Sequence, residues 1–216
     1  MTRAPSEVFR ERLLAEMPAI AAEAGWTDAA FAKAAEAAGL SEGEAMLAAP
    51  RGALDLMDAF AARADEAMLT ALEELDLGAM KVRARVRAAV SARLMAQRDY
   101  KEAARAMTRA LALRPAEAAR ILWRTADLIW RALGDASTDG NYYSKRAILS
   151  GVLGATYARW FADDDPNAEA TFAFLDARIE NIMQFERFKA KRIAPLGALA
   201  EEAAGIAARM RYGAGG

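Results

Sequence analysis

The stretch GWTDAAFAKAAEAAGLSEGEAMLAAPRGALDLMDAF, residues 25–60, decides the fold. Thr27 can cap a helix that ends at Gly39, because a hydroxyl accepts from the free N–H groups of a first turn and glycine adopts the left-handed conformation that ends many helices. A short helix follows from Ser41 to about Leu47, and after a break a longer helix starts at Leu54. This order of helix, glycine turn, short helix and long helix predicts a helix-turn-helix head.

The rest of the chain has apolar residues at helical spacing, and we find no strictly alternating segment that would predict a strand. The sequence therefore predicts an all-α fold. A hinge near Leu77 and Gly78 divides it into a helix-turn-helix-like subdomain at 1–76 and a helical domain at 77–190, followed by a C-terminal amphipathic helix at 191–216. Further helices are expected at Glu7 to Met17 with Ser6 as cap, at 81–94, 99–113 and 116–134, at about 139–161, and through Phe172, Leu175, Ile179 and Ile182.

The composition excludes several kinds of catalytic site. The 216 residues include no histidine and no cysteine, so the chain cannot build the usual zinc sites, a Ser-His-Asp triad or a di-iron site of the Glu-x-x-His type. We therefore expect no enzyme activity, no catalytic residue, no metal and no cofactor. Charges interrupt the first 17 residues and no apolar run approaches about 18 residues. The sequence thus predicts a cytoplasmic protein that meets a membrane only at its surface.

The predicted short helix argues against DNA binding. Residues 26–68 have the layout of a TetR-type regulator head, in which this helix would enter the major groove. Its residues, SEGEAML, offer Glu42 and Glu44 to the phosphates and contain no Lys, Arg, Asn or Gln for base edges. We expect a degenerate helix-turn-helix and no nucleic-acid partner, with a TetR-like ligand-responsive regulator as the alternative function.

Two helices of the second half could form the wall of a cavity. The helix at 116–134 has a wide apolar arc opposite a narrow polar face, and the next helix has small residues at steps of four, three and four: Ala147, Gly151, Gly154 and Ala158. Such residues either admit a neighbouring helix or leave room for a ligand, so a plain core and a cavity wall both fit. The arginines of the helix expected at 81–94 and the acidic run at 163–165 are expected to be solvated.

The span LWRTADLIWRALGDASTDGNYYSKRAIL, residues 122–149, resembles the ubiquinone (coenzyme Q) biosynthesis accessory family, coenzyme Q biosynthesis protein nine. FLDARIENIMQFE further on, GWTDAAFAKAAEAAGL and RGALDLMDAF are also similar to the family. The sequence departs from the family at Gly140, where an aromatic residue is usual, and at Tyr142, where tryptophan is usual.

This resemblance implies a TetR-regulator-like helical fold that binds isoprenoid lipids, including quinone precursors, and presents them to the demethoxyubiquinone hydroxylase. The hydroxylase-docking residues that it implies are Asp127, Trp130, Asp139, Asn141, Tyr142, Tyr143, Lys145 and Arg146. The lipid-binding residues are Leu122, Ile129, Leu149, Val152, Leu153, Tyr157, Leu175, Ile179 and Ile182. Tyr142→Lys or charge reversal at Arg146 is expected to impair docking with little effect on the melting temperature.

The last segment is amphipathic and has basic flanks. Its apolar side, Ile193, Leu196, Leu199, Ile206 and Met210, either contacts an anionic membrane surface or packs on the domain. With the resemblance, the first possibility implies a peripheral protein on the inner membrane. A homodimer is plausible only by analogy with TetR-type second halves.

Overall fold

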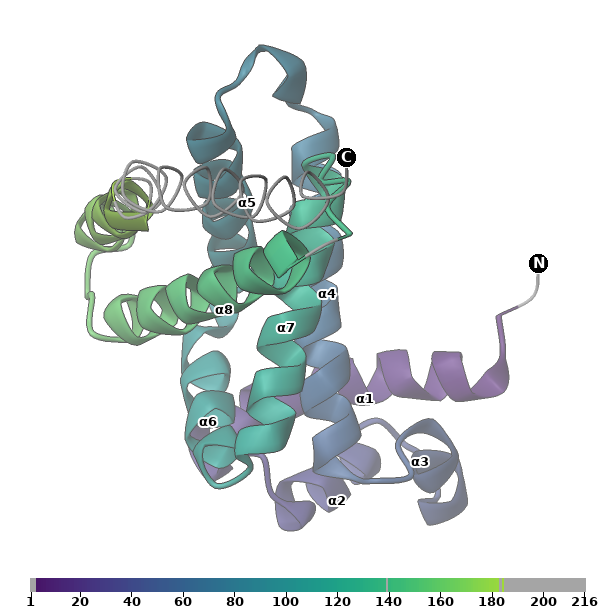
Figure 1. The fold of residues 1–216 in the computed structure, drawn as a ribbon. Coiled ribbons are helices and arrows are strands. Elements are labelled where there is room, and N and C mark those ends of the chain that lie inside the picture. Colours follow the sequence, from purple (N-terminus) through teal and green to yellow (C-terminus); the bar gives the residue numbers. More distant parts are fainter. Residues whose placement is uncertain (1–2, 139, 183, 185–216) are drawn as a thin grey trace, which may run out of the picture.

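The computed structural model describes residues 3–138, 140–182 and 184, and every regular element among them is a helix (Figure 1). This confirms the all-α prediction. The helices are α1 (Pro5–Ala24), α2 (Asp28–Ala37), α3 (Glu42–Ala48), α4 (Ala53–Glu73), α5 (Val82–Ala96), α6 (Lys101–Ala112), α7 (Pro115–Ala132) and α8 (Gly140–Phe161), with 3₁₀ turns η1 (Leu77–Ala79) and η2 (Arg98–Tyr100) and a last helical segment at residues 169–182. In the described part of the chain, no helix combines the length and the apolar character that crossing a membrane requires.

The predicted helix-turn-helix forms, and its ends are held as expected. The Thr27 hydroxyl accepts a 3.1 Å hydrogen bond from the Ala30 amide at the start of α2. Gly39 ends α2 at φ 62°, and the Leu40 amide donates to the carbonyl five residues back, which is the Schellman arrangement. Ser41 caps α3 in a capping box with Glu44. Figure 1 shows α2 and α3 together at one end of the long α4.

The prediction for α1 was wrong at both ends. The helix begins at Pro5 rather than after a Ser6 cap, because proline suits the first helical position. It also continues through Pro18 to Ala24. Proline lacks the N–H that would bond to the carbonyl four residues back, Leu14, and Nη1 of Arg63 on α4 donates to that oxygen instead, at 3.3 Å. This tertiary contact offsets part of the cost of an internal proline.

The head and the second half share one hydrophobic core. α1 packs against α2, α3, α4 and α6. In the second half, α5 packs against α4, and α8 packs against α7. The buried Trp26 indole donates to the Ala103 carbonyl of α6 at 2.9 Å. The cluster is continuous from Leu13 through Met57 to Leu153. The division at residue 76 stays a prediction.

One arginine of α5 corrects the expectation of a solvated set. Arg93 is 4% exposed, and its Nε lies 2.7 Å from Oδ1 of the equally buried Asp65 on α4. Its guanidinium also donates to the Tyr157 hydroxyl, which itself donates to Gln97 at 2.5 Å. The prediction failed because a buried carboxylate on another helix compensates the charge.

The acidic run after α8 was also predicted wrongly in part. Asp163 is buried, and its Oδ2 accepts from the Thr171 amide at 2.9 Å and from the Thr171 hydroxyl at 2.6 Å. These hydrogen bonds, that from the hydroxyl above all, hold the pKa of Asp163 below its usual value. Asp163 therefore fixes the first turn of the segment at 169–182 rather than facing water.

The small residues of α8 do not form a tight helix contact within the described residues. Ala147, Gly151 and Ala158 are exposed, and a Cβ on Gly151 would meet nothing within 4 Å. Gly154 approaches α7, because a Cβ there would lie 3.8 Å from Cδ1 of Leu122.

Candidate ligand pocket and docking surface

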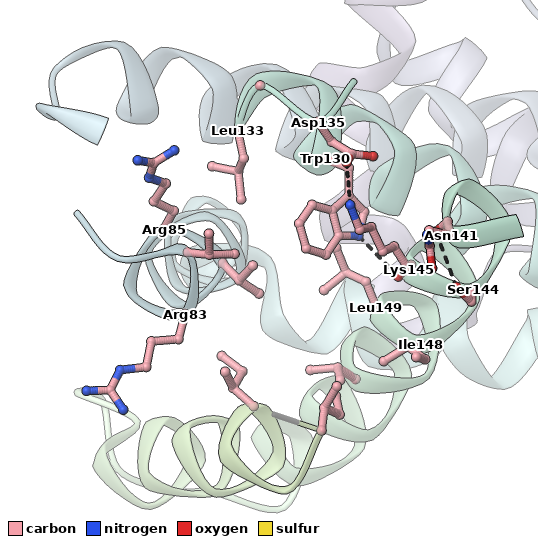
Figure 2. Close-up of a pocket in the computed structure, with 16 residues that line it drawn as sticks. Arg83, Arg85, Trp130, Leu133, Asp135, Asn141, Ser144, Lys145, Ile148 and Leu149 are labelled. Carbon is pink, nitrogen blue, oxygen red and sulfur yellow. Dashed lines mark hydrogen bonds and ion pairs between the residues drawn. The ribbon is translucent and has the colours of Figure 1, made fainter. Parts of the chain in front are cut away.

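A cavity of about 550 Å³ lies between α5, the end of α7, the first half of α8 and the segment at 169–182 (Figure 2). This volume falls within the range of small-molecule sites. The apolar side chains on its wall are Val82, Val86, Trp130, Leu133, Ile148, Leu149, Val152, Ile179 and Ile182. The polar ones are Arg83, Arg85, Asp135, Asn141, Ser144 and Lys145.

The polar side chains of the wall are gathered at its edges. Figure 2 shows the guanidinium groups of Arg83 and Arg85 directed away from Trp130, on the far side of α5. Both have partners: Arg83 lies 3.6 Å from Glu180, and Arg85 donates to the Met80 carbonyl at 2.9 Å. The interior is thus mainly hydrocarbon, so the pocket suits a ligand with a long apolar part.

The end of α7 places Asp135 beside the pocket. Gly134 adopts φ 80°, and the Asp135 amide donates to the Trp130 carbonyl at 2.9 Å, so the chain turns back over the last turn of the helix. The Asp135 side chain is 5% exposed. One carboxylate oxygen accepts from Lys145 at 2.6 Å and from Ser137 at 2.8 Å, and the other lies 3.1 Å from Arg146. Burial acts to raise the pKa of Asp135, but these hydrogen bonds prevail and lower it to about 2.

Lys145 and Trp130 close this side of the pocket together. The indole N–H of Trp130 donates to the Lys145 carbonyl at 3.1 Å. The Lys145 ammonium lies 5.4 Å from the centre of the indole ring, within range of a cation–π contact. The ring therefore stays fixed across the gap between α7 and α8.

Arg146 lies behind the pocket wall and is 1% exposed. Its Nε donates to Asp127 on α7 at 2.6 Å, and its Nη1 donates to the Tyr142 carbonyl at 3.1 Å as well as to Asp135. The guanidinium carbon lies 3.5 Å from the centre of the Tyr142 ring, whose hydroxyl donates to Asp127 at 3.2 Å. Burial acts to raise the pKa of Asp127, but the bonds from Arg146 and Tyr142 hold it below its usual value.

Trp123 on α7 and Tyr142 and Tyr143 on α8 form a cluster of rings that reaches the surface at Tyr143, here called the aromatic surface patch. Tyr143 is 64% exposed. Its ring centre lies 6.3 Å from that of Trp123 on α7 and 5.1 Å from that of Tyr142, which it meets edge-on. Large exposed aromatic groups are typical of protein interfaces.

The structure divides the predicted lipid-binding residues into two groups. Four of them, Leu149, Val152, Ile179 and Ile182, line the pocket. Ile129, Leu153 and Leu175 are fully buried in the core, and Leu122 is partly buried against it. Tyr157 is buried with its hydroxyl in the Arg93 cluster. These five residues are not part of the pocket wall as the structure places it.

The predicted docking residues are likewise distributed over three environments. Tyr143 is exposed and Tyr142 is half-buried, whereas Trp130, Lys145 and the exposed Asn141 line the pocket. Arg146 is buried in the protein interior. Charge reversal there is therefore expected to lower the stability of the fold, whereas the sequence analysis expected little change of the melting temperature. Asp127 pairs with the buried Arg146 and also accepts a hydrogen bond from the half-buried Tyr142. Asp139 and the five predicted membrane-contact residues of the last segment lie outside the described residues.

Sequence reasoning missed Asp135 and Trp123 as site residues. For Asp135 the available signal was its position one residue after the glycine that ends α7, since such a residue turns back toward the helix end. For Trp123 no spacing rule indicated a contact with Tyr143, which depends on how α7 and α8 cross. Among the described residues, no group of three or more carboxylates is placed to hold a metal ion.

Comparison with known proteins confirms the resemblance seen in the sequence. Residues 116–186 match the family model described as COQ9. The rat (Rattus norvegicus) ubiquinone biosynthesis protein COQ9, mitochondrial, is 31% identical over 188 residues, covering 82% of this chain and 59% of the rat protein. Its human (Homo sapiens) counterpart is 29% identical over 189 residues, covering 82% and 58%. The chain thus spans about three-fifths of the length of these curated relatives.

A solved structure also shares the fold. The TetR transcriptional regulator from Nitrosomonas europaea ATCC 19718 superposes with a TM-score of 0.65 at 21% identity, over 79% of this chain and 95% of the regulator. At this identity the likeness concerns the fold alone, and it confirms the predicted TetR-like architecture.

Proposed function

Because this chain is a homologue of the COQ9 ubiquinone biosynthesis proteins, with the family segment at residues 116–186, we propose that it serves ubiquinone biosynthesis as a non-enzymatic lipid-binding accessory factor. It binds an isoprenoid quinone precursor in the pocket between α5, α7 and α8 and presents it to the demethoxyubiquinone hydroxylase. The observation that carries the proposal is the pocket itself, apolar inside and polar only at its edges.

The size and chemistry of the pocket support a lipid. Each methylene group moved out of water contributes about 0.8 kcal/mol. Ten of them give roughly 8 kcal/mol, which sets an upper bound of about 1 μM on the affinity before the costs of association are subtracted. The indole of Trp130 and the aliphatic side chains of Val86, Leu149 and Ile182 offer such surface. The chain contributes no histidine or cysteine, so we assign the redox chemistry to the partner enzyme.

Lipid binding can be tested by native mass spectrometry of protein purified from lipid-rich cells. We expect an isoprenoid or other long-chain lipid on the wild type. Ile182→Asp should lose it, because the carboxylate would lie in the apolar wall. Leu113→Asp is the matched control, since Leu113 is 87% exposed and remote from the pocket. Wild-type protein that carries no lipid, or an Ile182→Asp variant that retains the lipid, would contradict the proposal. In a separate test, a deletion strain that accumulates no demethoxyubiquinone would also contradict it.

The aromatic surface patch is the proposed docking site for the hydroxylase. Tyr143→Ser should weaken hydroxylase binding without changing the melting temperature, because the Tyr143 side chain is largely exposed. Tyr100→Ser is the control, since Tyr100 is a 49% exposed tyrosine on η2. Equal binding by both variants would remove the patch from the interface.

The relatives are mitochondrial by name, and we propose that this chain acts peripherally on the inner membrane through residues 191–216. Removal of these residues should abolish flotation with anionic vesicles and leave a folded protein. Flotation that is unchanged would contradict the membrane contact.

The alternative, a DNA-binding regulator, predicts specific gel shifts with the neighbouring DNA at low salt. α3 exposes Met46 and Leu47 beside Glu42 and Glu44, a surface that repels phosphates. We therefore expect only salt-sensitive background.

A further inference from the structure

The first turns of α8 face both the pocket and the aromatic surface patch. Asn141, Ser144 and Lys145 line the pocket, and Figure 2 shows them together on the Trp130 side. Tyr142 and Tyr143, on the same turns, build the patch with Trp123. The pocket edge and the patch thus share residues 141–145 of α8.

Asp135 connects the two surfaces through side chains as well. One of its oxygens holds the Lys145 ammonium at the pocket edge at 2.6 Å, and the other lies 3.1 Å from Arg146. Arg146 in turn stacks on the Tyr142 ring at 3.5 Å and shares Asp127 with the Tyr142 hydroxyl. The contacts from the pocket edge to the patch are therefore charge-assisted hydrogen bonds and one cation–π contact, that of Arg146 on the Tyr142 ring.

We propose that occupancy of the pocket and docking of a protein on the aromatic surface patch are thermodynamically coupled, with Asp135 as the positioning residue that links them. The inference rests on the proposed function and adds to it a means of regulation. A polar ligand head that bonds to Lys145 competes with the Asp135 carboxylate for the ammonium. Asp135 then shifts toward Arg146, and the ring of Tyr142, which rests on that guanidinium, moves with it.

Linkage makes this coupling reciprocal, so that the ligand changes the affinity for the partner by the factor by which the partner changes the affinity for the ligand. The test uses the full chain, a short-tailed ubiquinone analogue as the probe and purified demethoxyubiquinone hydroxylase. The Kd of each is measured with and without a saturating amount of the other. We expect the same factor, roughly 5-fold or more, in both directions.

Asp135→Asn should bring this factor to about one, even if the variant's own affinity for the analogue or for the hydroxylase differs from that of the wild type. Asp58→Asn is the matched control and should keep the factor, because Asp58 also pairs with two arginines, Arg120 and Arg124, but away from the pocket. If Asp135→Asn fails to fold, Lys145→Met removes the ammonium that joins Asp135 to the pocket edge and should have the same effect on the factor.

The outcomes separate the two proposals. If the wild type binds both partners with a factor of one, or Asp135→Asn and Lys145→Met keep the wild-type factor, the coupling is refuted while the proposed function stands. If the wild type binds neither the analogue nor the hydroxylase, the proposed function is refuted and the coupling with it.

Discussion

Replacing Arg146 by methionine tests whether this residue belongs to the fold or to the docking surface. Methionine keeps most of the side-chain length but removes the charge and the donors. Arg146 is 1% exposed and bonds to Asp127 and Asp135. Removing one member of a buried ion pair typically costs about 3–5 kcal/mol. In the variant, Asp135 still pairs with Lys145 and Asp127 still pairs with Arg131. We therefore expect the free energy of unfolding to fall by about 3 kcal/mol, the lower end of that range.

The assay is urea unfolding together with thermal melting. For a chain of this size, 1 kcal/mol corresponds to about 2–4 °C, so Arg146→Met should lower the melting temperature by roughly 6–12 °C. Arg131→Met is the matched control, because Arg131 pairs with the same Asp127 at 2.9 Å but its side chain is 66% exposed. A surface pair contributes only about 0–1 kcal/mol. Equal losses in the two variants, or less than about 1 kcal/mol for Arg146→Met, would refute the structural role and return Arg146 to the docking surface.

Three further predictions concern stability. The pKa of Asp135 is lowered to about 2 from 3.8. Its ionised form therefore stabilises the fold fully above the unfolded pKa of 3.8, and this stabilisation is lost as pH falls from 3.8 through about 2. Urea unfolding between about pH 5 and pH 2 should show a shallower fall of stability for Asp135→Asn than for the wild type. Arg93→Met leaves Asp65 charged and buried, so it should cost about 3–5 kcal/mol by the same measurement, with Arg87→Met, whose pair with Asp176 is exposed, near zero. Gly39→Ala should lose about 1 kcal/mol because φ is 62° there, whereas Gly43→Ala, in an open helical position, should stabilise α3 or leave it unchanged.

The helices were predictable from the sequence because their signals are local. Thr27, Gly39 and Ser41 act on groups within a few residues, so reading the sequence placed α2 and α3 nearly where the structure has them. The extension of α1 beyond Pro18 was not predictable, since it depends on Arg63, which is 45 positions away in the sequence and reaches the carbonyl of Leu14. Local rules end a helix at proline unless another element supplies the missing donor.

Part of the candidate site was predictable for the same reason. Apolar spacing identified Ile179 and Ile182 as inward-facing, the family resemblance added Leu149 and Val152, and the structure places all four in the pocket wall. Neither spacing nor resemblance separates a pocket wall from a core: Ile129 from the apolar arc and Leu153 from the resemblance both pack inside. The buried pair of Arg93 and Asp65 was missed although both lie on the apolar stripes of α5 and α4. Opposite charges at inward positions of two helices were the signal available.

Three residues within one turn of α8 lie in three different environments, and this determines how variants at each of them can be interpreted. Lys145 acts at the pocket, Arg146 in the interior and Tyr143 at the surface. A loss of partner binding by a variant of Arg146 therefore does not locate the interface, because the fold and the Tyr142 ring change with it. Tyr143 contacts only the rings of Trp123 and Tyr142 among the aromatic groups described and is largely exposed, so its removal leaves the ion-pair network of Asp127, Asp135 and Arg146 intact. A binding defect of a Tyr143 variant at unchanged melting temperature therefore assigns the patch to the interface, whereas the same defect in an Arg146 variant does not.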